Sequence, residues 1–306
     1  MMGGRIRDVW ADNLELEMAH LRKKLEKYPF VAIDTEFPGI VARPIGVFRG
    51  STDYHFQTLR CNVDMLHMIQ LGLSVCDAEG NIPPDVCTWQ FNLRFDVTRD
   101  MCAPDSLELL TTAGLDFERH MRLGIDHTVF GELIVSSGLV LLDNITWVSF
   151  HSGYDFGYLL KLVTGEPLPD VEDDFFERLH LWFPCIYDVK YIMRSCKSLK
   201  GGLQDVADDL QISRIGQQHQ AGSDSLLTAL IFFKMRDSMF DGVLEESKYL
   251  GYIYGFSNAT SATRTQNGHL LYAPRANATP VPAHANADAL ASAHTHSPDD
   301  VGVGIE

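Results

Sequence analysis

A seven-residue stretch at positions 31–37, Val-Ala-Ile-Asp-Thr-Glu-Phe, constrains the fold of this chain more than any other feature. Apolar and β-branched side chains at its odd positions alternate with Ala32, Asp34 and Glu36, which is the two-residue period of a β-strand. The two carboxylates therefore share one face, roughly 6 to 7 Å apart, where anions in a half-buried setting repel each other. The pattern predicts either a polar face that meets water or a site for a divalent cation, whose other ligands the rest of the chain must supply.

The chain has 306 residues, of which 45% are hydrophobic and 22% are charged. These values are typical of a soluble globular protein with a full hydrophobic core, in one large domain or two small ones. The formal net charge of -16 argues against the broad basic face with which many proteins displace counterions from nucleic acid. A nucleic-acid partner would have to be bound locally, through metal ions and a few arginines or lysines.

The cysteines and the apolar runs exclude several classes of protein. No Cys-x-x-Cys pair occurs among the six cysteines, so neither a zinc ribbon nor a thioredoxin-type motif is available, and reduced, packed thiols are expected. No run approaches the roughly 20 apolar residues of a membrane span, and residues 1–10 lack the apolar core of a signal peptide. We therefore expect an intracellular protein with no membrane association.

Hydrophobic periodicity predicts strands and helices up to about Gly255. Strands are expected at 31–37, 68–77, 88–96, 145–150 and 185–188. Helices are expected at 14–25, from 53 to about 66, between 105 and 139 with breaks at Gly114 and Gly124, from 153, at about 171–183, before Leu210 and from about 222. Beyond Gly255 the sequence is rich in Ala, Thr, Asn, Pro and His and has almost no apolar periodicity. We therefore expect a folded domain at 1–255 and a disordered low-complexity tail at 256–306.

Three further residues are candidates for the same site as Asp34 and Glu36. Asp155 lies where the predicted strand 145–150 turns into a helix, and Asp224 lies at the start of a later helix, five residues after His219. Taken singly, each aspartate could simply complement a helix N-terminus, and His219 could be a loop or core residue. The order and spacing of all five make a common site the stronger interpretation.

This order resembles the DEDD superfamily of 3'-to-5' exonucleases, in its histidine-bearing branch. Three long runs narrow the resemblance to the Caf/Pop-type deadenylase subunit of the CCR-NOT complex, and the similarity covers about Trp10 to Gly255. The runs are FVAIDTEFPGIVARPIGVF at 30–48, WVSFHSGYDFG at 147–157 and SLKGGLQDVADDLQISRIGQQHQAGSDSLL at 198–227. The resemblance implies an α/β fold, a ribonuclease H-like mixed sheet flanked by helices, in a single domain.

Carried over to this sequence, the resemblance implies that Asp34, Glu36, Asp155 and Asp224 hold two Mg²⁺ or Mn²⁺ ions, with His219 as the general base. Hard divalent cations prefer carboxylate oxygens, and four converging carboxylates without lysine or arginine partners would need about that much positive charge. Two such ions can activate a water and stabilise a leaving oxygen, while an imidazole accepts a proton near neutral pH.

The resemblance further implies a poly(A)-specific exoribonuclease that hydrolyses the mRNA poly(A) tail from its 3' end and releases 5'-AMP. Its implied partners are the poly(A) tail, the large NOT scaffold subunit and the partner deadenylase of the CCR-NOT complex, and its implied location is the cytoplasm and nucleus. Two alternatives remain at this point. One is an inactive scaffold subunit of the same fold, and the other is a DNA exonuclease or proofreading module.

Contacts with RNA are expected to be few. Arg43 and Arg49 in the loop after the first strand are candidate phosphate contacts, and so are Lys197 and Lys200 before Gly201-Gly202. Exposed aromatic side chains, such as Phe37 or Tyr154, are candidates for stacking on a base.

Overall fold

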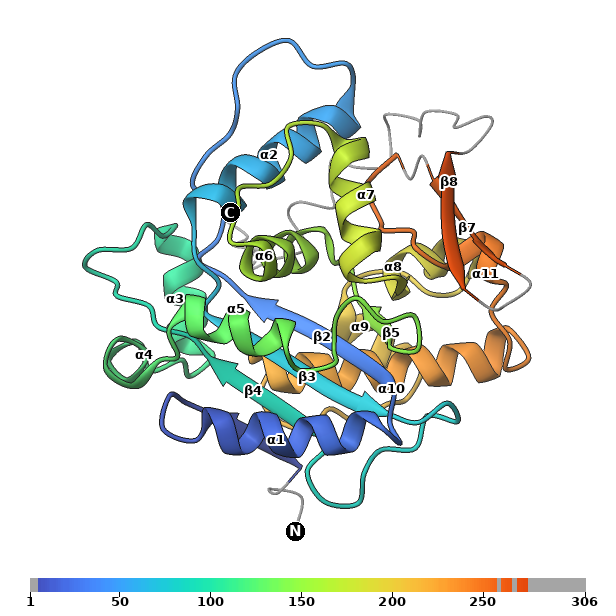
Figure 1. The fold of residues 1–306 in the computed structure, drawn as a ribbon, viewed down its shortest axis with the longest axis horizontal. Coiled ribbons are helices and arrows are strands. Elements are labelled where there is room, and N and C mark those ends of the chain that lie inside the picture. Colours follow the sequence, from blue (N-terminus) through green and yellow to red (C-terminus); the bar gives the residue numbers. More distant parts are fainter. Residues whose placement is uncertain (1–4, 258–259, 266–268, 275–306) are drawn as a thin grey trace, which may run out of the picture.

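The computed structural model describes residues 5–257, 260–265 and 269–274. Its centre is a six-stranded mixed sheet with the strand order β1-β4-β3-β2-β5-β6 (Figure 1). The strands are β1 (Ile6–Val9), β2 (Phe30–Glu36), β3 (Gln70–Cys76), β4 (Thr88–Asn92), β5 (Thr146–Ser149) and β6 (Cys185–Asp188). β2 is antiparallel to β3 and parallel to β5, so the strand that carries Asp34 and Glu36 lies inside the sheet. The predicted α/β fold with a mixed sheet is confirmed.

Helices cover both faces of this sheet (Figure 1). They are α1 (Leu14–Leu25), α2 (Ser51–Met65), α3 (Pro104–Thr112), α4 (Phe117–Leu123), α5 (His127–Val135), α6 (Gly153–Thr164), α7 (Glu172–Trp182), α8 (Val189–Ile192), the 3-10 turn η1 (Met193–Ser195), α9 (Leu203–Asp209), α10 (Ala221–Met239) and α11 (Glu246–Tyr249). Within the described part of the chain, none of them combines the length and apolar character that a bilayer crossing requires.

The alternation along β2 divides its side chains between two hydrophobic cores. Val31 and Ile33 pack into the core that contains the apolar faces of α1, α5 and α6. Ala32 packs into the second core, together with Leu227 and Ile231 of α10. Because side chains two apart on a strand share a face, Asp34 and Glu36 lie on the α10 side of the sheet. The sheet therefore directs both carboxylates toward the helix that carries Asp224.

The strand β1 was not among the expected elements. It adds a parallel edge to β4, with Ile6 opposite Thr88 and Val9 opposite Phe91. Its four residues include Arg7 and Asp8, so it is too short and too charged to carry a readable two-residue period. Only pairing with β4 gives this segment its structure.

Part of the segment beyond Gly255 is ordered, which differs from the expected tail at 256–306. β7 (Thr260–Arg264) and β8 (Leu270–Pro274) form an antiparallel hairpin. The ring of Tyr272 stacks on His180 of α7 with 3.6 Å between centroids, and Arg264 forms an ion pair with Glu246 at 2.9 Å. The expectation of disorder is therefore wrong for these two strands. Contacts with α7 and α11, rather than an apolar periodicity in their own sequence, hold them in place. Residues 275–306 lie outside the described residues.

Candidate functional site

The carboxylates of Asp34 and Glu36 lie on the α10 side of the sheet and receive no hydrogen bond from the residues around them that the structure describes. Burial raises the pKa of both groups well above the ordinary range, and repulsion from Asp224 and Asp155 raises it further. Glu36 is buried and Asp34 is half-buried, and a carboxylate shielded from water without donors is stable only when it is protonated or faces a cation. These two groups therefore have the electrostatic character of ion ligands.

Asp155 lies in the first turn of α6, where β5 gives way to the helix. The Thr35 hydroxyl donates a hydrogen bond of 2.6 Å to Asp155 Oδ1, which joins β2 to α6 inside the protein. Burial raises the pKa of Asp155 to about 7, although the hydrogen bond from Thr35 favours its charged form. The hydroxyl of Thr35 thus holds Asp155 against β2, and its role as an ion ligand stays a prediction.

A second buried carboxylate holds the turn that positions Asp155. Asp188, at the end of β6, is fully buried and accepts hydrogen bonds from the backbone N–H groups of His151 at 2.9 Å and Ser152 at 3.3 Å. His151 has a φ of 59°, a conformation that a residue with a side chain rarely adopts without such support. Asp188 also accepts from the N–H of Tyr254 at 3.0 Å, so it fixes the turn to the C-terminal part of the body.

The N-terminus of α10, which carries Asp224, is bound to the sheet by amide side chains. Gln90 Oε1 accepts from the N–H of Gly222 at 2.9 Å, and Gln70 Oε1 accepts from the N–H of Ala221 at 3.3 Å. These bonds satisfy donors that a helix N-terminus leaves unpaired. Gly72 of β3 allows the close approach, because a Cβ there would lie 1.9 Å from the carbonyl oxygen of Ala221. The two glutamines were not identified from the sequence, since each looks like an ordinary polar strand residue.

His219 and Asp224 come together at this helix end. The backbone N–H of His219 donates to Asp224 Oδ2 at 2.9 Å, and His219 adopts a φ of 59°. Glu36, His219 and Asp224 each offer a ligand atom, and these atoms all lie within 4.8 Å of one another. Three segments far apart in the chain, β2, the start of α6 and residues 219–224, carry the five predicted residues, and repulsion from Asp155 and Asp224 raises the pKa of Asp34 and Glu36.

The expectation that the carboxylates have no basic partner is wrong. Arg214, in the loop before α10, forms an ion pair with Asp224 through its Nη1, and this pair is almost entirely buried. The positive charge lowers the pKa of Asp224, against the larger effect of burial, which raises it. Nothing in the sequence marked Arg214, because its contact depends on how the loop folds back. One cation compensates part of the charge of four carboxylates, so the site remains acidic.

The donor set of this region fits hard divalent cations. It consists of carboxylate oxygens and one imidazole nitrogen, with no thiolate among the grouped residues. Mg²⁺ and Mn²⁺ prefer such oxygen-rich sets. No described residue donates a hydrogen bond to Asp34 or Glu36. A bound cation would therefore offset more uncompensated negative charge at these two carboxylates than at the other two. The assignment of individual ligand roles stays a prediction.

The candidate RNA contacts have different environments. Phe37 is buried, with 8% of its surface exposed, and its ring stacks on Tyr154 at 5.0 Å, so the expectation that Phe37 is exposed is wrong. Arg43 and Arg49 are exposed on an irregular loop between β2 and α2, as predicted. Lys197 and Lys200 are also exposed, and whether any of the four cations binds phosphate stays a prediction.

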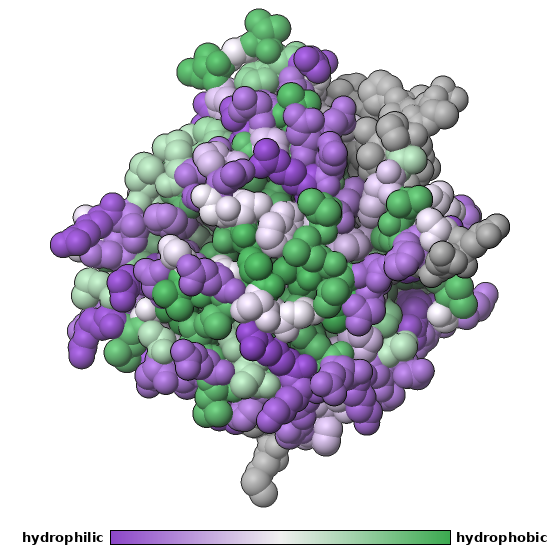
Figure 2. All heavy atoms as spheres, viewed as in Figure 1, coloured by the Kyte–Doolittle hydropathy of each residue, from purple (hydrophilic) through white to green (hydrophobic). Residues whose placement is uncertain are grey.

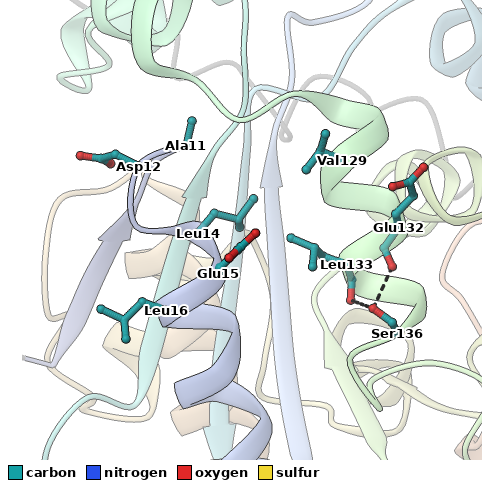
Figure 3. Close-up of a pocket in the computed structure, with 9 residues that line it drawn as sticks. All are labelled: Ala11, Asp12, Leu14, Glu15, Leu16, Val129, Glu132, Leu133 and Ser136. Atoms are coloured by element: carbon teal, nitrogen blue, oxygen red, sulfur yellow. Dashed lines mark hydrogen bonds between the residues drawn. The ribbon is translucent and has the colours of Figure 1, made fainter.

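Two surface hollows lie away from the carboxylates. The first, of about 670 Å³, lies between α1 and α5, and its walls include Leu14, Val129 and Leu133 (Figure 3). The second, of about 510 Å³, lies between α5 and α6. None of the five site residues lines either hollow, and Figure 2 shows hydrophobic residues gathered over α5 and α6 in the middle of this face.

Comparisons with known proteins give consistent results. Residues 9–129 and 138–232 match the family described as CAF1 family ribonuclease. The chain is 55% identical over 256 residues to the poly(A) ribonuclease pop2 of Schizosaccharomyces pombe, a match that covers 84% of this chain and 76% of that protein. It is 49% identical over 274 residues to the probable CCR4-associated factor 1 homolog 7 of Arabidopsis thaliana, covering 88% and 96% of the two chains.

Solved structures show the same fold. The structure of S. pombe Pop2p in its Mg²⁺ and Mn²⁺ bound form superposes with a TM-score of 0.80 at 55% identity, covering 82% of this chain and 99% of that one. CAF1 co-crystallised with the yeast NOT1 MIF4G domain superposes with a TM-score of 0.69 at 36% identity, covering 81% and 96%.

Proposed function

The chain belongs to the CAF1 family of ribonucleases, and we propose that it is a metal-dependent, poly(A)-specific 3'-to-5' exoribonuclease. Its substrate would be the mRNA poly(A) tail and its product 5'-AMP. The observation that carries this proposal is the convergence of Glu36, His219 and Asp224 within 4.8 Å of one another, beside Asp34 and Asp155. The relative named as a poly(A) ribonuclease supports the substrate.

In this proposal Asp34, Glu36, Asp155 and Asp224 hold two Mg²⁺ or Mn²⁺ ions. When bound, such a pair supplies activation of a water molecule and stabilisation of charge on the leaving oxygen. The relative whose structure contains Mg²⁺ and Mn²⁺ supports this choice of ions. The chain's own part is to fix the carboxylates: Thr35 orients Asp155, while the N–H of His219 orients Asp224.

The imidazole of His219 would accept the proton of the attacking water. The water oxygen forms a bond to the phosphorus of the last phosphodiester, and the bond from that phosphorus to the 3' oxygen of the preceding nucleotide breaks. The terminal nucleotide leaves as 5'-AMP, and the shortened chain takes up a proton at its new 3' hydroxyl. Each cycle therefore consumes one water and leaves a new 3' end for the next.

The two alternative functions have less support. An inactive scaffold subunit would be favoured by the loss of a site residue, but all five are present. A DNA exonuclease could use the same carboxylates. The 55% identity with a protein named as a poly(A) ribonuclease favours RNA instead.

A direct test uses purified protein and a 5'-labelled RNA that ends in a short run of adenosines. We expect stepwise shortening with Mg²⁺ or Mn²⁺, no shortening with EDTA, and at least about a hundredfold lower rate for Asp34→Ala, since a metal ligand is lost. Asp173→Ala, which removes an exposed carboxylate of α7, is the matched control and should keep the wild-type rate. Equal rates for the two variants would reject this site.

The same assay distinguishes the alternatives for substrate and product. A mixed-sequence RNA and a single-stranded DNA should be shortened more slowly than the adenosine run, and chromatography of the products should give 5'-AMP. Faster shortening of the DNA would favour the DNA exonuclease, and no shortening of any strand under any metal would favour the scaffold.

We further propose that the protein binds the large NOT scaffold and a partner deadenylase, in the cytoplasm and nucleus. The co-crystal of a relative with a NOT1 MIF4G domain supports the scaffold. The apolar face over α5 and α6 is suited to such a partner, because Val129 and Val135 are 49% and 40% exposed there.

Val135→Glu should weaken binding of a purified MIF4G domain, while Val243→Glu, which changes an exposed valine after α10, should not. Equal binding by both variants would place the scaffold on another face, and imaging of the tagged protein would test the location.

A further inference from the structure

Arg214 is the one feature of the acidic region that the proposed mechanism does not use. It lies in the loop between α9 and α10, and only 11% of its side chain is exposed. Its Nη1 donates to Asp224 Oδ1 and, at 3.1 Å, to Ser223 Oγ, while its Nε donates to Gln204 Oε1 at 2.7 Å. A guanidinium with three partners inside the protein has a defined position rather than a solvated one.

The charge of Arg214 reaches beyond its direct partner. It lowers the pKa of Asp34, Glu36 and Asp224, in each case against the stronger effect of burial. Asp155 is compensated differently, by the hydroxyl of Thr35. Arg214 therefore pairs directly with Asp224, and its charge also favours the ionised forms of Asp34 and Glu36.

This position places the charge of Arg214 beside any ion that Asp224 binds. Asp224 Oδ1 accepts from Arg214 and Oδ2 accepts from the N–H of His219, so each oxygen accepts one hydrogen bond and keeps a second lone pair for an ion. A divalent cation held by Glu36 and Asp224 would use one of these lone pairs. The guanidinium and the ion would then lie side by side with charges of the same sign, and their repulsion would weaken ion binding.

We propose that Arg214 is a displaceable counter-ion: it neutralises Asp224 while no divalent cation is bound, and it competes with the cation for that carboxylate. The proposal rests on the proposed function, since it takes the region to be an ion site. Its consequence is that Arg214 stabilises the ion-free protein and raises the cation concentration needed to fill the site. The hydrogen bond from Nε to Gln204 keeps the displaced side chain at the edge of the site.

Isothermal titration of the ion-free protein with MnCl₂ tests the competition. Arg214→Gln removes the charge and should bind Mn²⁺ about tenfold more tightly than the wild type, because the repulsion is gone. Arg214→Lys keeps the charge and should bind Mn²⁺ with nearly the wild-type affinity. Arg178→Gln removes an arginine from an exposed ion pair with Glu166 and should leave the affinity unchanged.

A role limited to positioning Asp224 predicts the opposite result, since the loss of Arg214 would then weaken Mn²⁺ binding. Unchanged or weaker binding by Arg214→Gln, in protein with a wild-type circular dichroism spectrum, would overturn the competition. Failure of the wild type itself to bind Mn²⁺ would instead reject the proposed ion site. The two failures are therefore distinguishable.

A second measurement avoids dependence on the folding of the variant. In the wild-type protein, the side-chain nitrogen NMR signals of Arg214 should report slow exchange without Mg²⁺, because its donors are bonded inside the protein. Saturating Mg²⁺ should shift the Nη signals and speed their exchange with water, while the Nε signal keeps its protection. Nη signals that stay unchanged at saturation would contradict the displacement.

Discussion

The hydroxyl of Thr35 donates a hydrogen bond of 2.6 Å to Asp155 Oδ1, although 120 positions separate the two residues in the chain. The bond joins the central strand β2 to the first turn of α6. It also gives Asp155 a hydrogen-bond donor. Burial raises the pKa of this carboxylate to about 7. Thr35 lies between Asp34 and Glu36, so one strand contributes two candidate ligands and the hydrogen bond that supports a third candidate, Asp155.

Replacing this donor should change the pH at which the site binds metal. Thr35→Val keeps the shape of the side chain but removes the hydroxyl, so the pKa of Asp155 should rise further. We expect the midpoint of Mn²⁺ binding to move to higher pH and the free energy of unfolding to fall by about 1–3 kcal/mol. Thr111→Val, at an exposed helix position, is the control, and an identical pH midpoint in the two variants would contradict this role.

The contribution of the site carboxylates to the stability of the metal-free protein should decrease as the pH rises above about 4, whereas buried histidines such as His120 and His180, whose pKa burial lowers, contribute in the opposite direction. Burial raises the pKa of Asp34, Glu36 and Asp155, so the folded protein holds protons that the unfolded chain releases at lower pH. Stability from this source is present at low pH and is lost as the pH passes the folded-state values. Thermal melts in EDTA would measure it.

Asp155→Asn provides the comparison for this pH dependence. The amide does not titrate, so the decline in melting temperature between about pH 4 and about pH 7 should be shallower than in the wild type. Added Mn²⁺ should remove most of the decline, because the cation replaces the protons. A variant with the same slope as the wild type would show that Asp155 does not titrate in this range.

Gly72→Ala should disturb the site without touching any of its five residues. The new Cβ would lie 1.9 Å from the carbonyl oxygen of Ala221, so the N-terminus of α10 must move away from β3. We expect a loss of about 1–3 kcal/mol in the free energy of unfolding and a lower rate, since Asp224 moves with the helix. Gly50→Ala, where a Cβ meets nothing within 4 Å, should change neither quantity.

Removing the β7–β8 hairpin should affect stability rather than chemistry. A protein that ends at Ser257 loses the stacking of Tyr272 on His180 and the ion pair between Arg264 and Glu246, but keeps the buried ring of Phe256. We expect a melting temperature lower by about 4–8 °C and an unchanged initial rate at 25 °C, because no candidate ligand lies in the hairpin. Ending the chain at Pro274 should leave both values unchanged, and a large loss of rate in either truncation would assign the C-terminal segment a direct role.

The candidate residues could be proposed from the sequence because each has a local signature. Asp34 and Glu36 follow the two-residue period of β2, and Asp155 follows an apolar strand that turns into a helix. His219 and Asp224 keep a fixed spacing of five at the start of α10. A periodicity or a spacing can be read from the order of the residues alone, so the sequence is enough to identify these residues as candidates.

The supporting residues were not predictable for the opposite reason. Gln70 and Gln90 bond to the backbone of α10 across more than a hundred positions, and Arg214 reaches Asp224 only because its loop folds back. The edge strand β1 and the hairpin also depend on distant partners, β4 and α7. These side chains have no local pattern that distinguishes them from ordinary polar residues. The two strand segments likewise have no pattern that distinguishes them from ordinary polar loops.

The sequence by itself indicated the central strand, most of the helices and the five candidate residues, four carboxylates and His219, because alternation and spacing are properties of neighbours along the chain. Only the tertiary structure decided that Arg214 shares the site, that Thr35 supports Asp155 and that amides of the sheet hold the start of α10. Burial, hydrogen bonding and charge compensation depend on which groups are close in space. These three effects determine the pKa values of the carboxylates and their positions.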